Sequence, residues 1–325
     1  MATEFEIVEF LRTMFPDIGD DAAIFELKEK GIVSVDTFIE SVHFPIMGTS
    51  IFSLHDIGYR TTVATLSDIA AMGGRALYLL VSIGVKKGER TWFKEFYDGV
   101  QQVLNMASVA QGVEVKVVGG DITYSENLII SMAVIGEAAT PITRGGAKPG
   151  DKIGVTGELG RIELAWYTLK QGGVLPDWLR IKLLQPQLRL KEGLTLCDHV
   201  HAMIDISDGL LLDLSHILRM SGNLGAVINL GKLPILDDVR EWCEKQGLNP
   251  IEYALSSGEE FELLFTYPPE VEEQINVGFT PIGEIIHKPG IYDNQGHKLT
   301  PMGWDHFARR TDPPNTLPTR LGIVY

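Results

Sequence analysis

Residues 202–220, AMIDISDGLLLDLSHILRM, indicate the fold class most directly. The run Ala202–Ile206 has the length and apolar character of a buried β-strand. From Ser207 to Met220 the apolar residues recur with the period of an amphipathic helix. A strand that leads through a short turn into a helix is the repeating unit of α/β structure. The predicted buried side of the helix carries Leu210, Leu211, Leu214, Ile217 and Leu218.

The same two periods recur along the rest of the chain, which predicts an α/β (α+β) protein. Before residue 143 we expect strands at 31–36, 77–85, 113–118 and 128–135, and helices at 1–14, 55–72 and 91–111. After it we expect strands at 152–156, 202–206, 261–267 and 279–286, and helices at 161–171, 187–197 and 207–220.

The segment Thr143–Asp151, TRGGAKPGD, interrupts this alternation with glycine and proline. Segments of this composition commonly connect domains, and 325 residues are enough for two compact domains. We therefore predict an N-terminal domain over residues 1–142 and a C-terminal α/β domain over residues 143–310. Residues 311–325, which include Pro313, Pro314 and Pro318, are predicted to form an extended tail.

Composition and charge exclude several classes of protein. The formal net charge is −15, whereas nonspecific binding to nucleic acid needs a basic surface. Cys197 and Cys243 are too few for a disulfide framework or a thiolate metal site. The apolar run Ala76–Val85 is too short to cross a membrane, and acidic residues interrupt the segment Met1–Met14 where a signal peptide would be apolar. We therefore expect a cytoplasmic protein that binds neither nucleic acid nor membrane.

Many carboxylates follow apolar strands or lie in turns rich in Gly, Ser and Thr, rather than on polar helix faces. Such turns hold a side chain at the end of a rigid element, where a ligand can approach the backbone. Single sites have local alternatives: Ser207 could cap the following helix, and Asp121 could form an Asx turn. The segments are 19–21 (GDD), 34–37 (SVDT), 67–68 (SD), 119–121 (GGD), 205–209 (DISDG) and 258–260 (GEE).

Together, these acids favour a cation site. Converging carboxylates repel one another unless cations lie between them, and oxygen ligands select Mg²⁺ or a similar ion. Arg144, inside the glycine-rich connector, could bind phosphate oxygens with its planar guanidinium or remain a surface arginine. His43 could contact a substrate or fill a niche in the core. The sequence contains no GxxxxGK[ST], HExxH or GxSxG motif.

In their order along the chain, these segments resemble the motifs of the thiamine-monophosphate kinase family, within the superfamily that includes aminoimidazole ribonucleotide synthetase. The resemblance covers nearly the whole chain, to about residue 307. The matching stretches are 19–25 (GDDAAIF), 34–37 (SVDT) with His43 and Phe44, 66–73 (LSDIAAMG), 119–123 (GGDIT), 143–151 (TRGGAKPGD), 155–157 (VTG), 204–210 (IDISDGL), 257–263 (SGEEFEL) and 303–307 (GWDHF).

The resemblance implies a two-domain fold, a homodimer joined through N-terminal strands, and transfer of the ATP γ-phosphoryl group to thiamine monophosphate with several Mg²⁺ ions. The implied metal ligands are Asp21, Ser34, Val35, Asp36, Asp68, Asp121, Asp205 and Asp208. The implied ATP contacts are Tyr97, Gly120, Asp121, Arg144 and Ser207, and the implied catalytic residues are Asp121, Arg144 and Asp208. The implied contacts to thiamine monophosphate are His43, Glu259 and Trp304.

Two positions depart from the family pattern. Glu260 stands where the family usually has Asp, and Ile122 replaces a Thr near the phosphates. Trp304 is implied to stack on the cationic thiazolium ring, while a place in the core is its alternative. Two other functions stay open at this point. One is another ATP-using enzyme of the superfamily, similar to aminoimidazole ribonucleotide synthetase, and the other is a noncatalytic domain that binds divalent cations or nucleotide.

Overall fold

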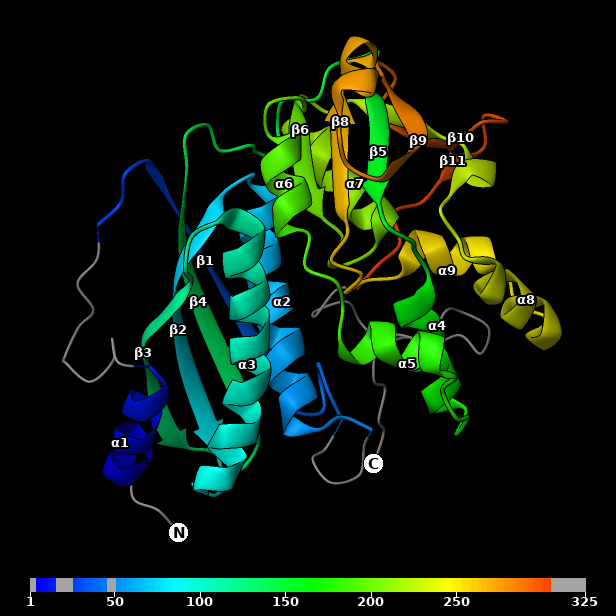
Figure 1. The fold of residues 1–325 in the computed structure, drawn as a ribbon. Coiled ribbons are helices and arrows are strands. Elements are labelled where there is room, and N and C mark those ends of the chain that lie inside the picture. Colours follow the sequence, from blue (N-terminus) through cyan, green and yellow to red (C-terminus); the bar gives the residue numbers. More distant parts are fainter. Residues whose placement is uncertain (1–3, 16–25, 46–50, 305–325) are drawn as a thin grey trace.

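The computed structural model of the protein describes residues 4–15, 26–45 and 51–304, which form two β-sheets with helices packed against them (Figure 1). The first part contains, in chain order, α1 (Glu4–Met14), β1 (Lys30–Ile39), α2 (Leu54–Ala71), β2 (Arg75–Val85), α3 (Arg90–Gln111), β3 (Lys116–Tyr124) and β4 (Ile129–Ala138). The second part contains β5 (Lys152–Thr156), α4 (Arg161–Lys170), α5 (Asp177–Leu184), α6 (Leu190–Leu196), β6 (Ala202–Asp205), α7 (Leu210–Met220), β7 (Gly225–Ile228), the 3-10 turn η1 (Leu230–Lys232), α8 (Asp237–Gln246), α9 (Pro250–Ser256), β8 (Leu263–Tyr267), η2 (Pro269–Gln274), β9 (Phe279–Ile286), β10 (Gly290–Asp293) and β11 (Lys298–Leu299).

The first sheet has four strands in the order β1-β4-β2-β3. β2 and β3 run parallel, whereas β4 is antiparallel to both β1 and β2. α2 packs on one face of this sheet, and α3 lies alongside α2 (Figure 1). Because side chains alternate along a strand, Ile32 and Phe38 of β1 are both buried on the face that α2 covers.

The opposite face of the first sheet carries apolar side chains that the described part of the chain leaves accessible. On β1 the side chains of Val33 and Val35 are 73% and 65% exposed. Val33 pairs with Ile135 and Val35 with Ala133 in the sheet, and half-buried residues of β2 continue both rows. We call this surface the open sheet face, and it consists of Val33, Val35, Tyr78, Leu80, Ala133 and Ile135.

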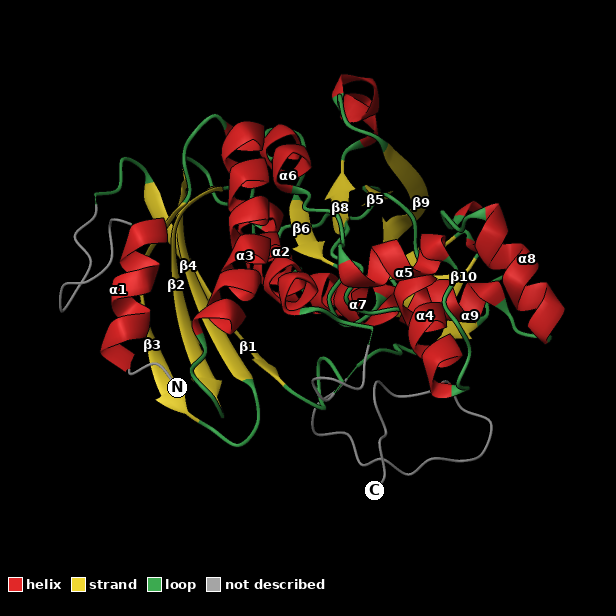
Figure 2. Cartoon of the chain, turned by 60° about the horizontal axis from the view of Figure 1, so that its bottom comes forward, coloured by secondary structure: helices red, strands yellow, loops and turns green. Residues whose placement is uncertain are grey.

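α2 is the element that both parts of the protein share. It begins at a capping box, in which the Asp56 amide donates to the Ser53 hydroxyl and the Ser53 amide donates to the Asp56 carboxylate, each at 3.1 Å. Most of its residues are buried, because α2 contacts the first sheet and α3 on one side and α5, α6 and β6 of the second part. Figure 2 shows α2 and α3 between the two sheets.

Glycines allow other backbones to approach α2 closely. A Cβ atom at Gly58 in α2 would lie 2.1 Å from the Phe96 carbonyl oxygen of α3, and one at Gly99 in α3 would lie 2.1 Å from the His55 carbonyl oxygen. A Cβ atom at Gly193 in α6 would lie 2.1 Å from a carbonyl oxygen near the end of α2. A side chain at any of these positions would therefore force two helices apart.

The second sheet has seven strands in the order β11-β10-β7-β9-β5-β8-β6. Its edge strand β6 ends at Asp205, and α7 begins at Leu210 after the turn Ser207–Gly209. α2 contacts β6, so the end of this edge strand lies beside the first part of the chain. The apolar positions predicted for the following helix are buried in α7, from Leu210 to Leu218.

The predicted α/β class is confirmed, and several predicted elements match closely, including β5 at Lys152–Thr156 and α3 at Arg90–Gln111. The strand predicted at 113–118 lies instead at Lys116–Tyr124. The helix predicted from Ser207 begins at Leu210, because its preceding turn folds around the side chain of Asp213. The sequence did not predict α5, α8, α9, β7, β10 or β11.

The strands of the first sheet end at Ala138, and those of the second begin at Lys152. The domain boundary at residue 143 stays a prediction, and the predicted tail 311–325 lies outside the described residues. Within the described ranges, no helix is both long and apolar enough to span a membrane.

Candidate active site

Acidic and hydroxyl side chains from both parts of the chain meet beside α2. Ser34 and Asp36 alternate with the exposed residues of β1 and so lie on its α2 side. The Ser34 hydroxyl donates to the Asp68 carboxylate on α2. The Ser67 hydroxyl, also on α2, donates to Asp205 Oδ2 on β6 at 2.8 Å. We call Asp36, Asp68 and Asp205 the acid cluster.

Ionisation is unfavourable for Asp36 and Asp205, because their carboxyl groups are buried close to other acids. Burial, followed by the charge of Asp68, raises the pKa of Asp36 from 3.8 to about 6. Burial also raises the pKa of Asp205 well above its ordinary value, with further contributions from Asp68 and Asp213. A raised carboxyl pKa means that the anion is disfavoured where it stands, and a bound cation would reverse this effect.

The ligand atoms of the acid cluster fit magnesium, since they are carboxylate and hydroxyl oxygens. Over residues 4–15, 26–45 and 51–304, no three His, Cys, Asp or Glu side chains are grouped so that they alone could hold one metal ion. Mg²⁺ usually keeps several waters and binds through one or two carboxylates plus substrate phosphates. The cluster therefore fits ions that share their ligands with a nucleotide. Asp21, another predicted metal ligand, lies outside the described residues.

Asp213 organises the turn that follows β6. Its Oδ2 accepts the backbone N–H groups of Ser207, Asp208 and Gly209 at 3.1, 3.1 and 3.0 Å. Burial and the charge of Asp208 raise the pKa of Asp213 to about 7, against these hydrogen bonds. A Cβ atom at Gly209, where φ is 134°, would lie 2.6 Å from the carbonyl oxygen of Ser256. The Ser207 amide already donates to Asp213, so the predicted contact between Ser207 and ATP would involve the Ser207 hydroxyl.

Arg144 is exposed on the connector that precedes β5. Two amides of this connector donate to the hydroxyl of Ser221, at the end of α7, at 3.1 and 3.0 Å. The pKa of His216 on α7 is lowered by burial and by the charges of Arg219 and Arg144. The charge of Asp208 opposes this shift but does not cancel it. His216 therefore lies within electrostatic reach of both Arg144 and Asp208, two of the predicted catalytic residues.

Gly120 and Asp121 lie inside β3, opposite Val81 and Ser82 of β2, rather than in an isolated turn. The φ angle of Gly120 is 155°, and a Cβ atom there would lie 1.9 Å from the Val81 carbonyl oxygen. Only glycine fits this position. Both residues are exposed, so a ligand can reach the Gly120 backbone and the Asp121 carboxylate.

Two predicted substrate contacts lie against the turn after β6. The Trp304 amide donates to the Asp208 carbonyl oxygen at 2.9 Å, and the Glu259 amide donates to the Ser207 carbonyl oxygen at 2.8 Å. The Glu259 carboxylate is buried and forms an ion pair with Arg60 of α2. Trp304 and Glu259 thus come together with Ser207 and Asp208, although they are far apart in the sequence.

The other predicted contacts take positions that local packing explains. His43 follows the end of β1, where its Nδ1 accepts from the Ile39 amide at 3.0 Å. Tyr97 is 3% exposed, and its ring centroid lies 5.1 Å from that of Phe15, which favours a packing role over contact with ATP. The Val35 side chain belongs to the open sheet face, so only its backbone could reach a metal ion on the other side.

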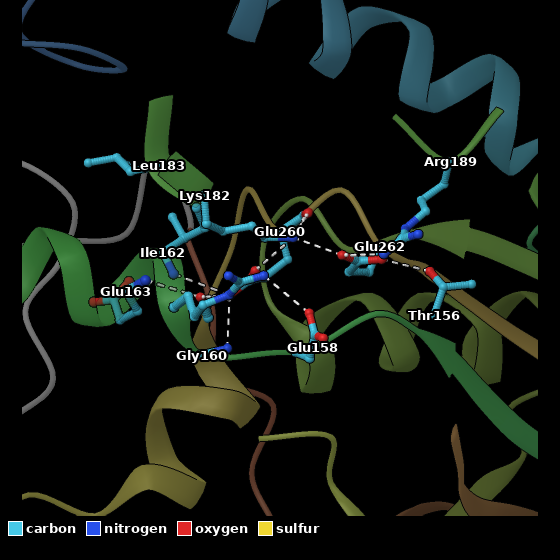
Figure 3. Close-up of polar contacts among 12 residues, drawn as sticks. Thr156, Glu158, Gly160, Ile162, Glu163, Lys182, Leu183, Arg189, Glu260 and Glu262 are labelled. Atoms are coloured by element: carbon cyan, nitrogen blue, oxygen red, sulfur yellow. Dashed lines mark hydrogen bonds and ion pairs between the residues drawn. The ribbon is translucent and has the colours of Figure 1, made fainter. Parts of the chain in front are cut away.

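Glu260, which departs from the family pattern, is buried and stabilises the start of α4. Its Oε1 accepts from the amides of Gly160 and Ile162 at 2.8 and 3.3 Å (Figure 3). Gly160 precedes the helix and has no side chain with which to cap it. The Glu260 carboxylate supplies that cap from a distant loop, and its negative charge is favourable at a helix N-terminus.

Sequence reasoning missed Arg60, Ser67 and Asp213. Arg60 and Glu259 are 199 residues apart, and Ser67 and Asp205 are 138 residues apart, so no local pattern reports either pair. The available signal was a polar residue on the apolar side of a predicted helix. Asp213 lies between buried leucines of α7, and Ser67 lies between Leu66 and the cluster residue Asp68.

Known proteins resemble this chain along almost its whole length. Residues 19–138 match the AIR synthase related protein, N-terminal domain, and residues 148–290 match the AIR synthase related protein, C-terminal domain. The thiamine-monophosphate kinase of Pyrococcus horikoshii is 34% identical over 312 residues, which cover 94% of this chain and 96% of that protein. The thiamine-monophosphate kinase of Escherichia coli is 31% identical, with 90% and 91% covered.

A solved structure shares the fold as well. AaThiL complexed with AMPPCP and TMP superposes with a TM-score of 0.78 at 31% identity, over 94% of this chain and 99% of that chain. The residues matched by the two family models include Asp36, Asp68 and Asp205 of the acid cluster. The chain therefore belongs to the thiamine-monophosphate kinases of the AIR synthase related family.

Proposed function

We propose that this protein phosphorylates thiamine monophosphate to thiamine diphosphate, with ATP as phosphoryl donor and Mg²⁺ as cofactor. The observation that carries the proposal is the similarity to thiamine-monophosphate kinases over 94% of the chain. A relative at 31% identity, complexed with AMPPCP and TMP, supports the pairing of a nucleotide with a second ligand in this fold.

The acceptor of this reaction is a phosphate, whose oxygen is already ionised at neutral pH. No strong base is needed, so catalysis rests on aligning two anionic groups and neutralising their charge. In our proposal Asp36, Asp68, Asp205 and Asp208 hold Mg²⁺, and Ser34, Asp121 and Asp21 complete the set of ligands. When bound, Mg²⁺ neutralises charge on the phosphate oxygens.

Residues from three segments of the chain bind ATP in this proposal. The Gly120 backbone and the Asp121 carboxylate contact ATP from β3, and the Ser207 hydroxyl contacts it from the turn after β6. Arg144 orients the transferred group, because its guanidinium can donate two parallel hydrogen bonds to phosphate oxygens. Its electrostatic reach to His216, which Asp208 shares, supports a place near the turn after β6.

Thiamine monophosphate binds beside the same turn in our proposal. Trp304 and Glu259 hydrogen-bond to the carbonyl oxygens of Asp208 and Ser207. A substrate held by these residues has its phosphate next to the acids that bind the nucleotide. His43, at the end of β1, approaches from the first part of the chain. The proposal also includes a cytoplasmic homodimer joined through the open sheet face.

Product analysis tests the proposed function. Purified protein with ATP, Mg²⁺ and thiamine monophosphate is expected to form ADP and thiamine diphosphate in equal amounts. ATP turnover that requires an amide or formyl acceptor instead would favour the alternative similar to aminoimidazole ribonucleotide synthetase. Tight binding of nucleotide without any turnover would favour the noncatalytic alternative.

A further inference from the structure

The loop that carries Glu259 adopts an unfavourable backbone conformation. Glu259 and Phe261 have φ angles of 56° and 53°, in the left-handed region that residues with a Cβ atom rarely adopt. The residue between them, Glu260, therefore presents its carbonyl oxygen in a direction that the loop would not choose alone. Such conformations persist only where surrounding contacts enforce them, and they concentrate at functional sites.

Lys182 of α5 contacts the Glu260 carbonyl oxygen, between these two left-handed residues. Its Nζ donates to the Glu260 carbonyl oxygen at 3.1 Å and to Glu262 Oε1 at 2.7 Å, and it lies 3.5 Å from Glu260 Oε2. The Lys182 side chain is only 4% exposed. Figure 3 shows it reaching toward Glu260 and Glu262. One buried ammonium group therefore holds the peptide between the two left-handed residues.

Further donors fix the side chain of Glu262 next to Lys182. Arg189 donates to Glu262 Oε2 at 2.5 Å and to its Oε1 at 3.1 Å, and the Thr156 hydroxyl donates to Oε2 at 2.8 Å (Figure 3). Two cations, Lys182 and Arg189, thus face two anions, Glu260 and Glu262. Lys182, Glu260 and Glu262 are buried, while Arg189 is partly buried and also pairs with Glu192; this pairing offsets the cost of removing the charges from water.

The opposite edge of the loop contacts the candidate active site. The Glu259 amide donates to Ser207 O at 2.8 Å, and the Phe261 amide donates to Ile206 O at 3.0 Å. The turn at Ser207 has its own support from Asp213, whereas Lys182 supports the loop at Glu259 together with the Arg60 ion pair and the amides that bind Glu260 Oε1. Loss of the Lys182 contact should therefore disturb Glu259 more than the predicted ATP site.

We infer that Lys182 is a positioning residue, which fixes Glu259 for thiamine monophosphate by donating to the Glu260 carbonyl oxygen without touching either substrate. The inference rests on the proposed function, since it takes Glu259 as a contact to that substrate. It assigns a role in substrate binding to a buried lysine of a helix that lies outside the acid cluster.

The test uses a variant that removes the donor and keeps the buried charges balanced. Lys182→Met with Glu260→Gln leaves Glu262 paired with Arg189, and the new amide oxygen can still accept at the start of α4. We expect the double variant to melt near the wild-type temperature, while Lys182→Met alone melts lower. Its KM for thiamine monophosphate should rise about tenfold, which corresponds to one hydrogen-bonded contact, with the KM for ATP within about twofold. Lys94→Met, which removes a lysine from an exposed ion pair on α3, is the control and should change neither KM.

An unchanged KM for thiamine monophosphate in a stable double variant would overturn the inference. If the double variant does not fold, Lys182→Arg decides the question, because it keeps the charge but displaces the donor from the carbonyl oxygen. A raised KM for thiamine monophosphate then supports positioning, and an unchanged KM leaves Lys182 a purely structural role.

Hydrogen exchange separates this inference from the proposed function. A wild-type protein that forms no thiamine diphosphate overturns the proposed function, yet the Glu259 amide still reports on the loop. We expect this amide to exchange faster in the Lys182 variants, while the Asp213 amide, which donates to Gly209 O at 2.9 Å, is unchanged. Equal exchange of the Glu259 amide in variant and wild type would overturn the positioning role.

Discussion

The backbone amide of Trp304 donates a hydrogen bond to the carbonyl oxygen of Asp208 at 2.9 Å. The preceding residue makes this approach possible, since a Cβ atom at Gly303 would lie 2.5 Å from the same oxygen. A residue proposed to bind thiamine monophosphate is thereby attached to a residue proposed to bind Mg²⁺. In the proposed reaction the two substrates would then bind at neighbouring positions.

Trp304→Ala should raise the KM for thiamine monophosphate and leave the KM for ATP nearly unchanged. Loss of a cation–π contact of about 0.5–2 kcal/mol corresponds to roughly 2- to 30-fold in binding. Trp304→Phe should retain most of the affinity, because the face of the ring makes the contact. Steady-state kinetics with each substrate varied, beside a melting curve, measure this. A stable alanine variant with wild-type KM for thiamine monophosphate would rule out the stacking role.

Asp68→Asn should abolish most of the turnover and stabilise the metal-free protein. The substitution removes the negative charge that helps to raise the pKa values of Asp36 and Asp205. We therefore expect a higher melting temperature in the presence of a chelator, and a smaller increase on adding Mg²⁺ than the wild type shows. Asp98→Asn on the exposed face of α3 is the control. Wild-type rates in Asp68→Asn would remove this residue from the metal site.

Glu262→Gln should lower stability near neutral pH, and less so in acid. Burial alone would raise the pKa of Glu262, but Lys182 and Arg189 outweigh it and hold the pKa below 4.5. An acid with a lowered folded-state pKa stabilises the fold above its unfolded pKa, and this contribution disappears as pH falls through the folded pKa. Breaking such a buried pair removes about 3–5 kcal/mol.

Denaturant titrations of wild type and Glu262→Gln over a range of pH measure this difference. The gap in unfolding free energy should be constant from neutral pH down to about the unfolded pKa of 4.5 and then close. Glu126→Gln, which removes the carboxylate of an exposed ion pair with Lys86, provides the control and should leave the melting temperature unchanged. A gap that widens in acid would contradict the sign of the shift.

Val33→Glu should convert a dimer into a monomer. The wild-type protein is expected to show twice the mass of one chain in light scattering, because burial of the open sheet face removes apolar surface from water. A carboxylate at this position would be buried at the interface without a partner. Val109→Glu, at an 85% exposed position on α3, is the matched control and should remain dimeric. A wild-type monomer would refute the predicted assembly.

The elements that were predicted correctly are those with a clear local pattern of apolar residues. β5 was placed at Lys152–Thr156, because its apolar run and the flanking glycines are visible in the sequence. β7 and β10 have four residues each, and they become strands only by pairing with each other and with their outer neighbours, β9 beside β7 and β11 beside β10. No short run of residues carries that information. α8 is largely polar and buries only Val239 and Cys243, so few apolar residues mark its buried side.

The candidate site likewise contains residues that the sequence could predict and residues that it could not. Asp36, Asp205 and Asp208 could be proposed because each comes close after apolar residues and the family motifs include them. The strand expected at 31–36 does not end at Asp36, since β1 continues to Ile39, and Asp205 is the last residue of β6. Ser207 was predicted as a possible helix cap, but the carboxylate of Asp213 binds that turn from inside the helix. Lys182 and Glu262 are 80 residues apart, and their pairing is decided by how α5 packs against α4 and α2. The sequence alone therefore could not predict that Lys182 and Glu262 form an ion pair.

The close approach of α3 and α6 to α2 limits how the protein can move. Gly58 and Gly99 leave no space for a methyl group between α2 and α3 within the first part, and Gly193 leaves none between α6 and α2, where the two parts meet. A rotation of α6 against α2 would therefore press the backbone at Gly193 against the backbone at Ala70. We expect labels placed on β4 and β9 to keep their separation when nucleotide binds, so that substrates enter and products leave by movement of loops rather than by separation of the two sheets.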